Sequence, residues 1–476
     1  MTLAGSRISW RWCALLVVMA ALALWIGWVG FIASDDSLYY AGARAWLTHP
    51  PAAGTDHWST RFPLILPFAG VIAALGPGFA AFGVTAVLFY TLLVTLTGLF
   101  ARNVGGQRAG WIAALLIATL PVVIVYASTV SVDLAEAAAL VGGALLLGGA
   151  ADDRAGLWRG LGAGLCFGIA ILCRETSVLP LAAFVPMFLI GRPVPRRVLV
   201  TMVVGVALVL GTEALFQYAM TGDPLRRYAI AFHHDEHIDR AANLEGNFLL
   251  WPPIDPLLVL LVNDDFGLLF WLAGIALALG AARGLAPGAR RRLIVLSGMA
   301  GASFLLVAVL YTKLVLNPRY FTLAAVAAAV VLALWLDRLA ARWRALLLAA
   351  ILGSNLLLLS VGNRHPHWEM EVLADAARSH PREIVAGNPH EVRRAEIPMA
   401  FAHLANLRYA PARPGGLVVA PAASAPPGAI VAHYPVPPTR LGQMLRALGL
   451  EGIVPAPVAR RMFAPGAEMV LVRTRG

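Results

Sequence analysis

The chain has few of the residues that hold small secreted domains together or bind soft metals. Its 476 residues include only three cysteines, Cys13, Cys166 and Cys173, and each of them lies inside an apolar run. They form no even-numbered set and no Cys-x-x-Cys spacing, so the sequence indicates neither a disulfide framework nor a thiolate metal site. We interpret the three thiols as small core residues.

Charged residues are also scarce. They make up 13% of the chain against 59% hydrophobic residues, which is typical of a polytopic membrane protein and excludes a soluble multidomain enzyme. The net charge of +11 does not indicate nucleic-acid binding, because the arginines stand between apolar segments and form no basic face. Lysine occurs only once, at Lys313.

Long apolar runs, in contrast, are abundant. A helix needs about 20 apolar residues to cross a bilayer, and on that basis we predict about eleven membrane-spanning helices. Arg7 and Arg11 before the first run resemble the start of a signal peptide, but no small-residue cleavage site precedes Asp35, so we expect an uncleaved helix. The predicted spans lie near 12–33, 79–101, 110–128, 133–150, 157–173, 176–190, 197–219, 266–282, 293–312, 319–336 and 344–361.

Basic residues between the spans predict the orientation of the chain. With a cytoplasmic N-terminus, the arginine-rich connections all fall on the cytoplasmic side, as the positive-inside rule requires. This places loops 34–78 and 220–265, and everything after residue 361, on the periplasmic side of a bacterial-type inner membrane. Segment 64–76 is too short to span, and we expect an interfacial or re-entrant helix there after the breaks at Pro63 and Pro67.

The last part of the chain, 362–476, has a different character. Its apolar runs are only four to seven residues long, and four of them, 383–387, 416–420, 429–434 and 468–474, are typical of short strands, while 439–449 has helical spacing. The predicted architecture is therefore an all-α membrane module over 1–361 followed by a small periplasmic α/β domain. No phosphate-binding or nucleophile motif occurs in that domain, so it is either a structural cap or a guide for an acceptor.

Polar residues gather directly after the first span. Asp35 and Asp36 follow it, Tyr39 comes one helical turn later, and His57, Trp58 and Arg61 complete the stretch. An ionised side chain costs about 2.5 to 3.5 kcal/mol at bilayer depth, so an acidic pair here faces either solvent or a polar cavity. A solvated loop explains the pair alone, but one loop holding two carboxylates and a cation favours a functional site.

Further charged residues occur at the same predicted level of the membrane. For each one, a helix-end snorkel or an interhelical salt bridge is an alternative explanation. Those alternatives do not predict that all of them lie on the outer side of different spans, which favours a shared site. A compact ammonium such as that of Lys313 suits phosphate as a point charge. The residues are Asp133, Glu136, Arg174, Glu175, Lys313 and Arg319.

In their order and sidedness these residues resemble the GT-C class of membrane glycosyltransferases, in the branch of the protein O-mannosyltransferases and the lipid A aminoarabinose transferases. The resemblance covers the membrane module, about three quarters of the chain, and not the tail. Phe62 stands where the more usual motif has a first proline. The matching features are Asp35-Asp36 with Tyr39, Arg61 before Phe62-Pro63-Leu64, Asp133 at the outer start of the fourth span, Arg174 before a T-x-L-P stretch, and the pair Arg319-Tyr320.

The resemblance implies transfer of a sugar from a polyprenyl-phosphate donor to a hydroxyl of a lipid, glycan or protein on the periplasmic face, with inversion. Such a reaction needs a base for the acceptor's proton and positive charge for the departing phosphate. On this basis Asp35 is the expected base, and Asp133 or Asp36 orients the acceptor or shares a proton or cation. The expected phosphate ligands are Arg61, Lys313, Arg319 and Arg174, with Tyr39, Tyr320 and Glu136 in support.

A cofactor is not firmly indicated. Acidic clusters suit divalent cations such as Mg²⁺, Mn²⁺ or Ca²⁺, so a divalent cation stays open. His233, His234 and His237 offer imidazole ligands, but consecutive residues rarely converge on one ion, and a solvated, acceptor-facing loop explains them equally. Asp264 and Asp265 are explained equally well as favourable charges at a helix N-terminus.

Two other functions compete with catalysis. A transporter or flippase for a lipid or a polyprenyl-phosphate-linked sugar would also bury charges between spans, but it should show internal repeats, which the sequence lacks. A membrane scaffold that presents the tail would have no need of Asp35 or Lys313. The sequence predicts neither the sugar, nor the acceptor, nor the oligomeric state.

Overall fold

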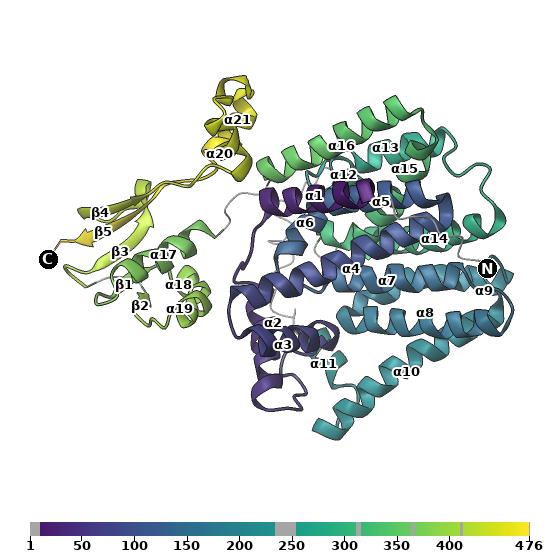
Figure 1. The fold of residues 1–476 in the computed structure, drawn as a ribbon. Coiled ribbons are helices and arrows are strands. Elements are labelled where there is room, and N and C mark those ends of the chain that lie inside the picture. The colour runs from purple at the N-terminus through teal and green to yellow at the C-terminus, as the bar shows by residue number, and fades with distance from the viewer. Residues whose placement is uncertain (1–9, 234–253, 311–315, 363–366, 410–412, 476) are drawn as a thin grey trace.

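Helices form most of the described chain as far as residue 362, and a small sheet follows them (Figure 1). The structure is a computed structural model that describes residues 10–233, 254–310, 316–362, 367–409 and 413–475. The helical part and the sheet-containing tail lie at opposite ends of the molecule, and the N-terminal end of α1 points away from the tail. This arrangement makes the tail an addition to one end of a helical bundle.

Seven helices in the described part of the chain are long and apolar enough to cross a membrane. The chain is therefore a multi-pass membrane protein, as its composition predicts. These seven are α1 (Trp10–Gly27), α4 (Phe79–Gly105), α8 (Arg154–Cys173), α10 (Arg196–Thr221), α14 (Pro287–Leu310), η3 with α15 (Pro318–Phe321 and Thr322–Arg338) and α16 (Ala341–Gly362).

The other four predicted spans are helical but short or broken. α5 (Gln107–Thr119) and α6 (Pro121–Ser128) meet at a bend of 63° and count as an eighth span only if joined. α7 (Asp133–Gly148) has 16 residues, and α13 (Leu269–Ala278) has 10. Segment 175–190 divides into the 3-10 helix η1 (Glu175–Ala183) and α9 (Phe184–Ile190). The number eleven remains a prediction.

Two breaks in these helices have local causes. Pro121 has no N–H and disfavours helical geometry in the residue before it, and Leu120 is accordingly extended, with φ −65° and ψ 126°. At the end of α8, Arg174 is extended as well, with φ −155° and ψ 131°, and Pro180 lies inside the 3-10 turn that follows. The second break turns the chain at Arg174, where the candidate site is built.

Close packing of α8 against α10 depends on small residues. Gly160, Gly164 and Gly168 stand one turn apart on α8 and face α10. A Cβ added at Gly164 would lie 2.0 Å from the carbonyl oxygen of Met202, and one added at Gly205 would lie 2.3 Å from that of Leu161. The two backbones therefore touch, as in other membrane helix pairs with repeated small residues.

Gly164→Ala should destabilise the protein by about 1 to 3 kcal/mol, because the new methyl group overpacks the contact and forces the helices apart. The measurement is the Tm of the purified protein in detergent or nanodiscs. Gly211 on α10 is the matched control, since a Cβ there meets nothing within 4 Å. An unchanged Tm for Gly164→Ala would show that the close contact between α8 and α10 does not exist in solution.

Short helices cover the end of the bundle nearest the tail. They include α2 (Asp35–Thr48), α3 (Phe62–Leu75), α11 (Arg226–His233) and α12 (Asp255–Val262). Aromatic rings pack α2 and α3 onto the long helices: Trp46 stacks on Phe216 of α10 at 5.9 Å, and Tyr40 stacks on Phe82 of α4 at 5.3 Å. These contacts fix the segment that carries Asp35 against the bundle.

The tail contains a five-stranded sheet in the order β2-β1-β3-β5-β4. β1 (Val385–Gly387) pairs in parallel with β2 (Leu407–Tyr409) and β3 (Leu417–Pro421), while β5 (Met469–Thr474) pairs antiparallel with β3 and β4 (Gly428–Tyr434). All four predicted strands are present, and β2 was not predicted. The tail helices are α17 (Trp368–Ser379), α18 (Pro389–Arg394), α19 (Glu396–Phe401), α20 (Arg440–Ala447) and α21 (Ala456–Phe463).

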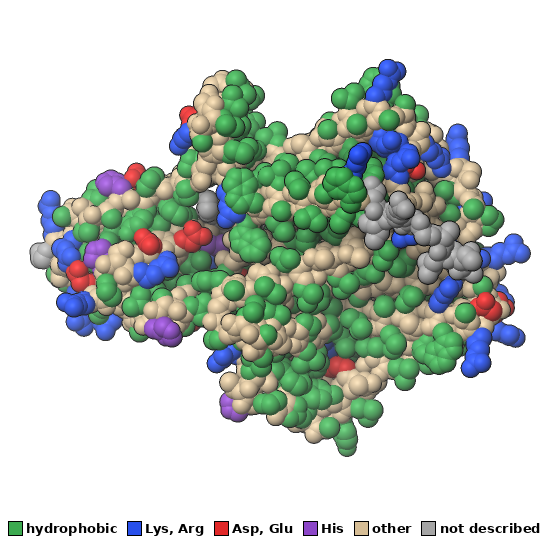
Figure 2. Space-filling view, viewed as in Figure 1, with side chains coloured by type: hydrophobic (Ala, Val, Ile, Leu, Met, Phe, Trp, Pro, Cys, Tyr) green, Lys and Arg blue, Asp and Glu red, His purple; other side chains and the backbone are tan. Residues whose placement is uncertain are grey.

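The tail contacts the bundle through both rings and polar groups. The ring of Phe401 lies 5.6 Å from that of Tyr40 and 5.1 Å from that of Phe79. The hydroxyls of Ser360 and Thr439 are 2.7 Å apart. On the face shown in Figure 2, hydrophobic side chains cover the middle of the bundle, and basic side chains lie at the end away from the tail and on the tail itself.

Candidate active site

Two carboxylates begin α2 at the tail-facing end of the bundle. Asp35 and Asp36 are its first two residues, where the positive end of the helix dipole favours negative charge. They have different surroundings. The Asp35 side chain is 35% exposed, whereas Asp36 is fully buried. Only Asp35 is thus accessible to a substrate.

Asp36 is engaged by its own backbone. Its carboxylate accepts hydrogen bonds from the N–H groups of Ile32 at 2.7 Å, Ser34 at 2.8 Å and Ser37 at 3.0 Å. Burial raises the pKa of Asp36 to about 6, while these three donors act in the opposite direction, so the group is mostly ionised at neutral pH. Asp36 therefore holds the turn that leads into α2.

Arg61, at the start of α3, is buried beside two neutral groups. Its guanidinium donates to the Tyr39 hydroxyl and to Nε2 of His57, which must accept because arginine has no acceptor atom. Burial raises the pKa of Tyr39 to about 12, so the phenol stays neutral. Neither of these partners neutralises Arg61, so its positive charge adds to the potential of the site.

Arg174 joins α8 to the start of α7. Its guanidinium lies 2.5 Å from Asp133 and 3.1 Å from Glu136, and it stacks on the ring of Tyr320 at 5.1 Å. The hydroxyl of Ser177 donates to Glu136 at 2.6 Å. All of these groups are largely buried, so Arg174 is held between two carboxylates and an aromatic face.

Arg319 lies in the 3-10 turn η3 that opens α15. The Asn317 side chain accepts a hydrogen bond from the Arg319 N–H at 3.1 Å and fixes the turn. The Arg319 guanidinium is 3.7 Å from the Asp35 carboxylate and 5.8 Å from the centre of the Tyr320 ring. Its side chain is 29% exposed, so this ion pair is looser and more accessible than that of Arg174.

The predicted residues converge on one region. Asp133, Glu136, Arg174, Arg319 and Tyr320 line a single cleft. The Tyr39 hydroxyl accepts from Arg61, and the charges of Asp35, Asp133 and Arg174 also affect its pKa, so Tyr39 lies near these groups. Side chains from α2, α3, α7, η1 and η3, distant in sequence, thus form one polar cluster inside an apolar bundle.

Some predicted residues cannot be placed. Lys313, His234 and His237 lie outside the described residues. His233 ends α11, is exposed, and its Nδ1 lies 2.6 Å from the carbonyl oxygen of Ala229. In the described ranges no three His, Cys, Asp or Glu side chains come close enough to hold a metal ion.

Arg227 is a site residue that the sequence did not reveal. It is fully buried, and it donates to the carbonyl oxygen of Thr60 at 2.6 Å, to that of Leu172 at 2.8 Å and to Glu175 at 2.8 Å. Thr60 precedes Arg61 directly, Glu175 follows Arg174 directly, and Leu172 lies two residues before Arg174. Arg227 therefore ties together the two segments that present those cations. Its neighbour Arg226 has the same side chain, so no sequence signal distinguishes it.

Comparison with known proteins gives both a family match and structural matches. Residues 61–216, about a third of the chain, match the family model described as dolichyl-phosphate-mannose-protein mannosyltransferase. The structure is similar to the crystal structure of ArnT from Cupriavidus metallidurans bound to undecaprenyl phosphate, with a TM-score of 0.61, 15% identity, and coverage of 84% of this chain and 86% of that one. No curated protein matches by sequence.

Two further structures give the same result. ArnT in the apo state has a TM-score of 0.60 at 14% identity, covering 90% of this chain and 96% of that one. The apo oligosaccharyltransferase of Archaeoglobus fulgidus has a TM-score of 0.53 at 14% identity, covering 82% of this chain and 64% of that one. The chain has the GT-C fold. The resemblance to GT-C membrane glycosyltransferases is thereby confirmed.

The family match covers only some of the residues of the candidate active site. The match begins at Arg61 and includes Asp133, Glu136 and Arg174, but it ends before Arg319 and does not contain Asp35. The convergence of Asp35 and Arg319 with the matched residues comes from the structure. The residues outside the match thus complete the same polar cluster.

Proposed function

We propose that this protein transfers a sugar from a polyprenyl-phosphate donor to an acceptor hydroxyl on the periplasmic face of the inner membrane, with inversion. One observation carries the proposal: the accessible carboxylate of Asp35 lies 3.7 Å from Arg319, at the edge of a cluster that also holds Arg61 and Arg174. A base beside several cations is the set that this reaction needs. The GT-C fold and the bound undecaprenyl phosphate of ArnT support it.

The chemistry assigns one task to the base and another to the cations. Asp35 takes the proton of the acceptor hydroxyl as its oxygen bonds to the anomeric carbon, and the bond from that carbon to the phosphate oxygen breaks. A polyprenyl phosphate leaves with its negative charge, so positive charge replaces a general acid. Attack on the face opposite the phosphate inverts the configuration.

Competition for Arg319 links donor binding to the base. Arg319 contacts Asp35 at a distance that is long for a tight ion pair, and the donor's phosphodiester offers a competing negative charge and two free oxygens, with more charge developing as its bond to the sugar breaks. A phosphate at Arg319 would draw the guanidinium away and leave Asp35 to accept a proton. Arg61, which donates to the neutral groups of Tyr39 and His57, contributes the second positive charge.

The geometry narrows the roles of the other residues. Arg174 is bound to Asp133 and Glu136, which favours a positioning role for it over direct contact with the donor. Asp133 keeps one buried oxygen without a hydrogen bond in the described structure, and that oxygen is suited to orient the acceptor or Arg319. Asp36 is bound to backbone N–H groups and shapes the turn that presents Asp35.

A panel of radiolabelled polyprenyl-phosphate sugars tests the proposal. The purified protein in nanodiscs should consume one member of the panel and release polyprenyl phosphate. A flippase would move a labelled donor between leaflets without breaking the sugar-phosphate bond. Transport with an intact donor would overturn the transferase assignment.

Periplasmic placement of the site predicts a labelling pattern. In a variant without the three native cysteines, a cysteine at the exposed tail position Ser424 should react with an impermeant thiol reagent in intact spheroplasts. A cysteine at Ala286, exposed at the opposite end before α14, should react only after lysis. The reverse pattern would put the candidate site on the cytoplasmic side.

Donor affinity separates phosphate binding from a structural role of the cations. A charge-assisted contact contributes about 1.5 to 3 kcal/mol, so Lys313→Ala and Arg319→Ala should each weaken donor binding about tenfold or more while the Tm changes little. If both residues contact one phosphate, the effects in the double mutant should depart from additivity. Unchanged affinity with a lowered Tm would show instead that these cations hold helices together.

A further inference from the structure

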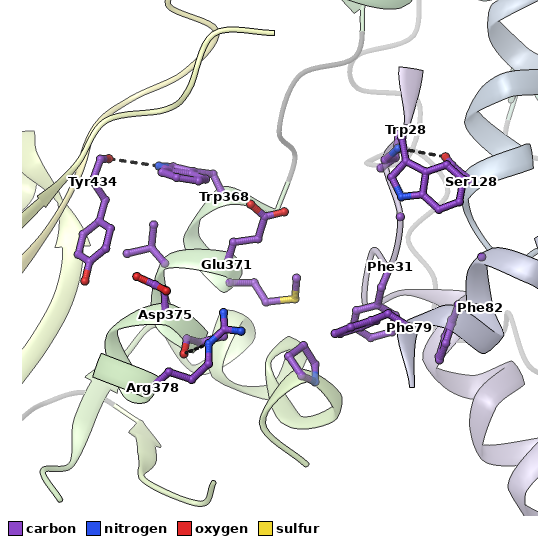
Figure 3. Close-up of a pocket in the computed structure, with 17 residues that line it drawn as sticks. Trp28, Phe31, Phe79, Phe82, Ser128, Trp368, Glu371, Asp375, Arg378 and Tyr434 are labelled. Atoms are coloured by element: carbon purple, nitrogen blue, oxygen red, sulfur yellow. Dashed lines mark hydrogen bonds between the residues drawn. The ribbon is translucent and has the colours of Figure 1, made fainter. Parts of the chain in front are cut away.

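Outside the polar cluster, a cavity of about 500 Å³ lies between the bundle and the tail. Figure 3 shows its two walls. Trp28, Phe31 and Phe79 come from the bundle on one side, and residues of α17 with Tyr434 of β4 come from the tail on the other. Neither part of the chain forms this cavity alone, so the docked tail completes it.

The bundle wall consists of aromatic rings. Trp28 follows α1 directly and packs against α4, where a Cβ at Gly83 would come within 3.2 Å of its ring. Phe79 begins α4 and is 47% exposed. Both residues stand at the ends of membrane-crossing helices, at the level where lipid head groups and aromatic belts lie. The cavity is therefore placed for the head of a lipid.

The tail wall adds polar and charged groups. Trp368 donates from Nε1 to the carbonyl oxygen of Tyr434 at 3.3 Å, which fixes its ring at the cavity. Glu371 and Asp375 stand one turn apart on α17, and both are exposed. Arg378 is the only basic residue among the described lining residues, and its Nε donates to its own helix at 3.1 Å from the carbonyl oxygen of Ala374. The wall is thus more acidic than basic.

We propose that this cavity binds the sugar part of a lipid-linked acceptor, and that this sugar is neutral or carries an amine. Aromatic faces pack against the C–H faces of sugar rings, and carboxylates accept hydrogen bonds from hydroxyls or ammonium groups. The exposed carboxylate of Asp375 in the lining disfavours a phosphorylated head. Calling the occupant the acceptor rests on the proposed transferase function.

The cavity and the candidate base are connected through the chain. Phe31 precedes Asp35 by four residues, so their Cα atoms are at most about 14 Å apart. Both backbone groups of Ile32, in the segment between them, are hydrogen-bonded. Arg394 of the tail donates to the Ile32 carbonyl oxygen at 3.1 Å, and the Ile32 N–H donates to the Asp36 carboxylate. A sugar held in the cavity would therefore lie close to the segment that carries Asp35.

The test is binding of soluble sugars to the full-length protein in nanodiscs, without donor. The probes are maltotriose, fully deacetylated chitotriose and glucose 6-phosphate. Maltotriose and the amine trisaccharide should bind, the latter more tightly, and glucose 6-phosphate should not. Asp375→Asn and Trp28→Leu should each weaken trisaccharide binding about tenfold, whereas Trp28→Phe should restore part of it.

Controls separate this site from folding and from the donor site. Glu396→Gln on α19 and Trp343→Leu at the other end of the bundle, neither of which lines the cavity, should leave binding unchanged. Donor-lipid affinity should be the same in Asp375→Asn as in the wild type. Equal trisaccharide binding in all variants, or a preference for glucose 6-phosphate, would overturn the assignment of the cavity as a sugar site. Failure of donor turnover alone would remove the transferase function but leave the sugar site intact.

Discussion

Asp35→Asn should lower the rate of sugar transfer by a factor of about 100 or more. Asparagine keeps the size of the side chain and can still accept a hydrogen bond, but it cannot take a proton, and a positioned base contributes about 10² to 10⁴ in rate. Since the Asp35 side chain is 35% exposed and its ion pair with Arg319 spans 3.7 Å, the folded state should lose little stability. The measurement is turnover of donor together with the Tm.

Asp36→Asn is the matched comparison, because it removes the neighbouring carboxylate. Two oxygens of Asp36 accept three backbone N–H bonds, whereas an asparagine has one acceptor oxygen. We expect this variant to lower the Tm more than Asp35→Asn does. Near-normal turnover in well-folded Asp35→Asn protein would remove Asp35 from the role of base.

Arg227→Met should lower the stability of the protein more than any of the substitutions named above. It removes a fully buried guanidinium and leaves Glu175 and the carbonyl oxygens of Thr60 and Leu172 without their donor. Breaking a buried ion pair in this way costs about 3 to 5 kcal/mol, so the Tm should fall by several degrees. Because those segments present Arg61 and Arg174, turnover should fall at least about tenfold even at temperatures where the variant is folded.

Two further variants distinguish positioning from stability alone. Adding Glu175→Gln to Arg227→Met removes the unpaired carboxylate and should recover part of the lost Tm, but not the turnover, since the two segments are still not tied together. Arg226→Met replaces the half-buried neighbour and should change both quantities much less. If turnover and Tm recover together in the double variant, Arg227 has only a structural role.

Much of the architecture could be predicted because the bilayer imposes simple length rules. Each long apolar run that was predicted to span the membrane contains a helix. The strands of the tail followed from shorter apolar runs with β-branched residues. The number of spans could not be predicted, since a bend at Pro121 or a 3-10 turn at Pro180 divides runs of suitable composition. The strand β2 was missed because its three residues, Leu407–Tyr409, carry no pattern of their own.

The sequence predicted that the residues of the candidate site lie close together, but not which carboxylate pairs with which cation. Shared sidedness brought Asp35, Asp133 and Arg319 to one level of the membrane, and the structure places them together. Which carboxylate binds which cation depends on the packing of α7 against α8, and Asp36 is occupied by backbone groups that no sequence pattern reveals. Helix packing and local backbone hydrogen bonds thus decide which of two similar residues is accessible.

The most direct test is the position of the bound carrier phosphate, determined from an experimental structure of the protein in nanodiscs with polyprenyl phosphate, the leaving group of the proposed reaction. We predict that the phosphate lies within about 4 Å of the guanidinium groups of Arg319 and Arg61, and that Arg319 has moved away from Asp35. A phosphate bound elsewhere, with Arg319 still paired to Asp35, would contradict the proposed site and the role of Asp35 as the base beside it.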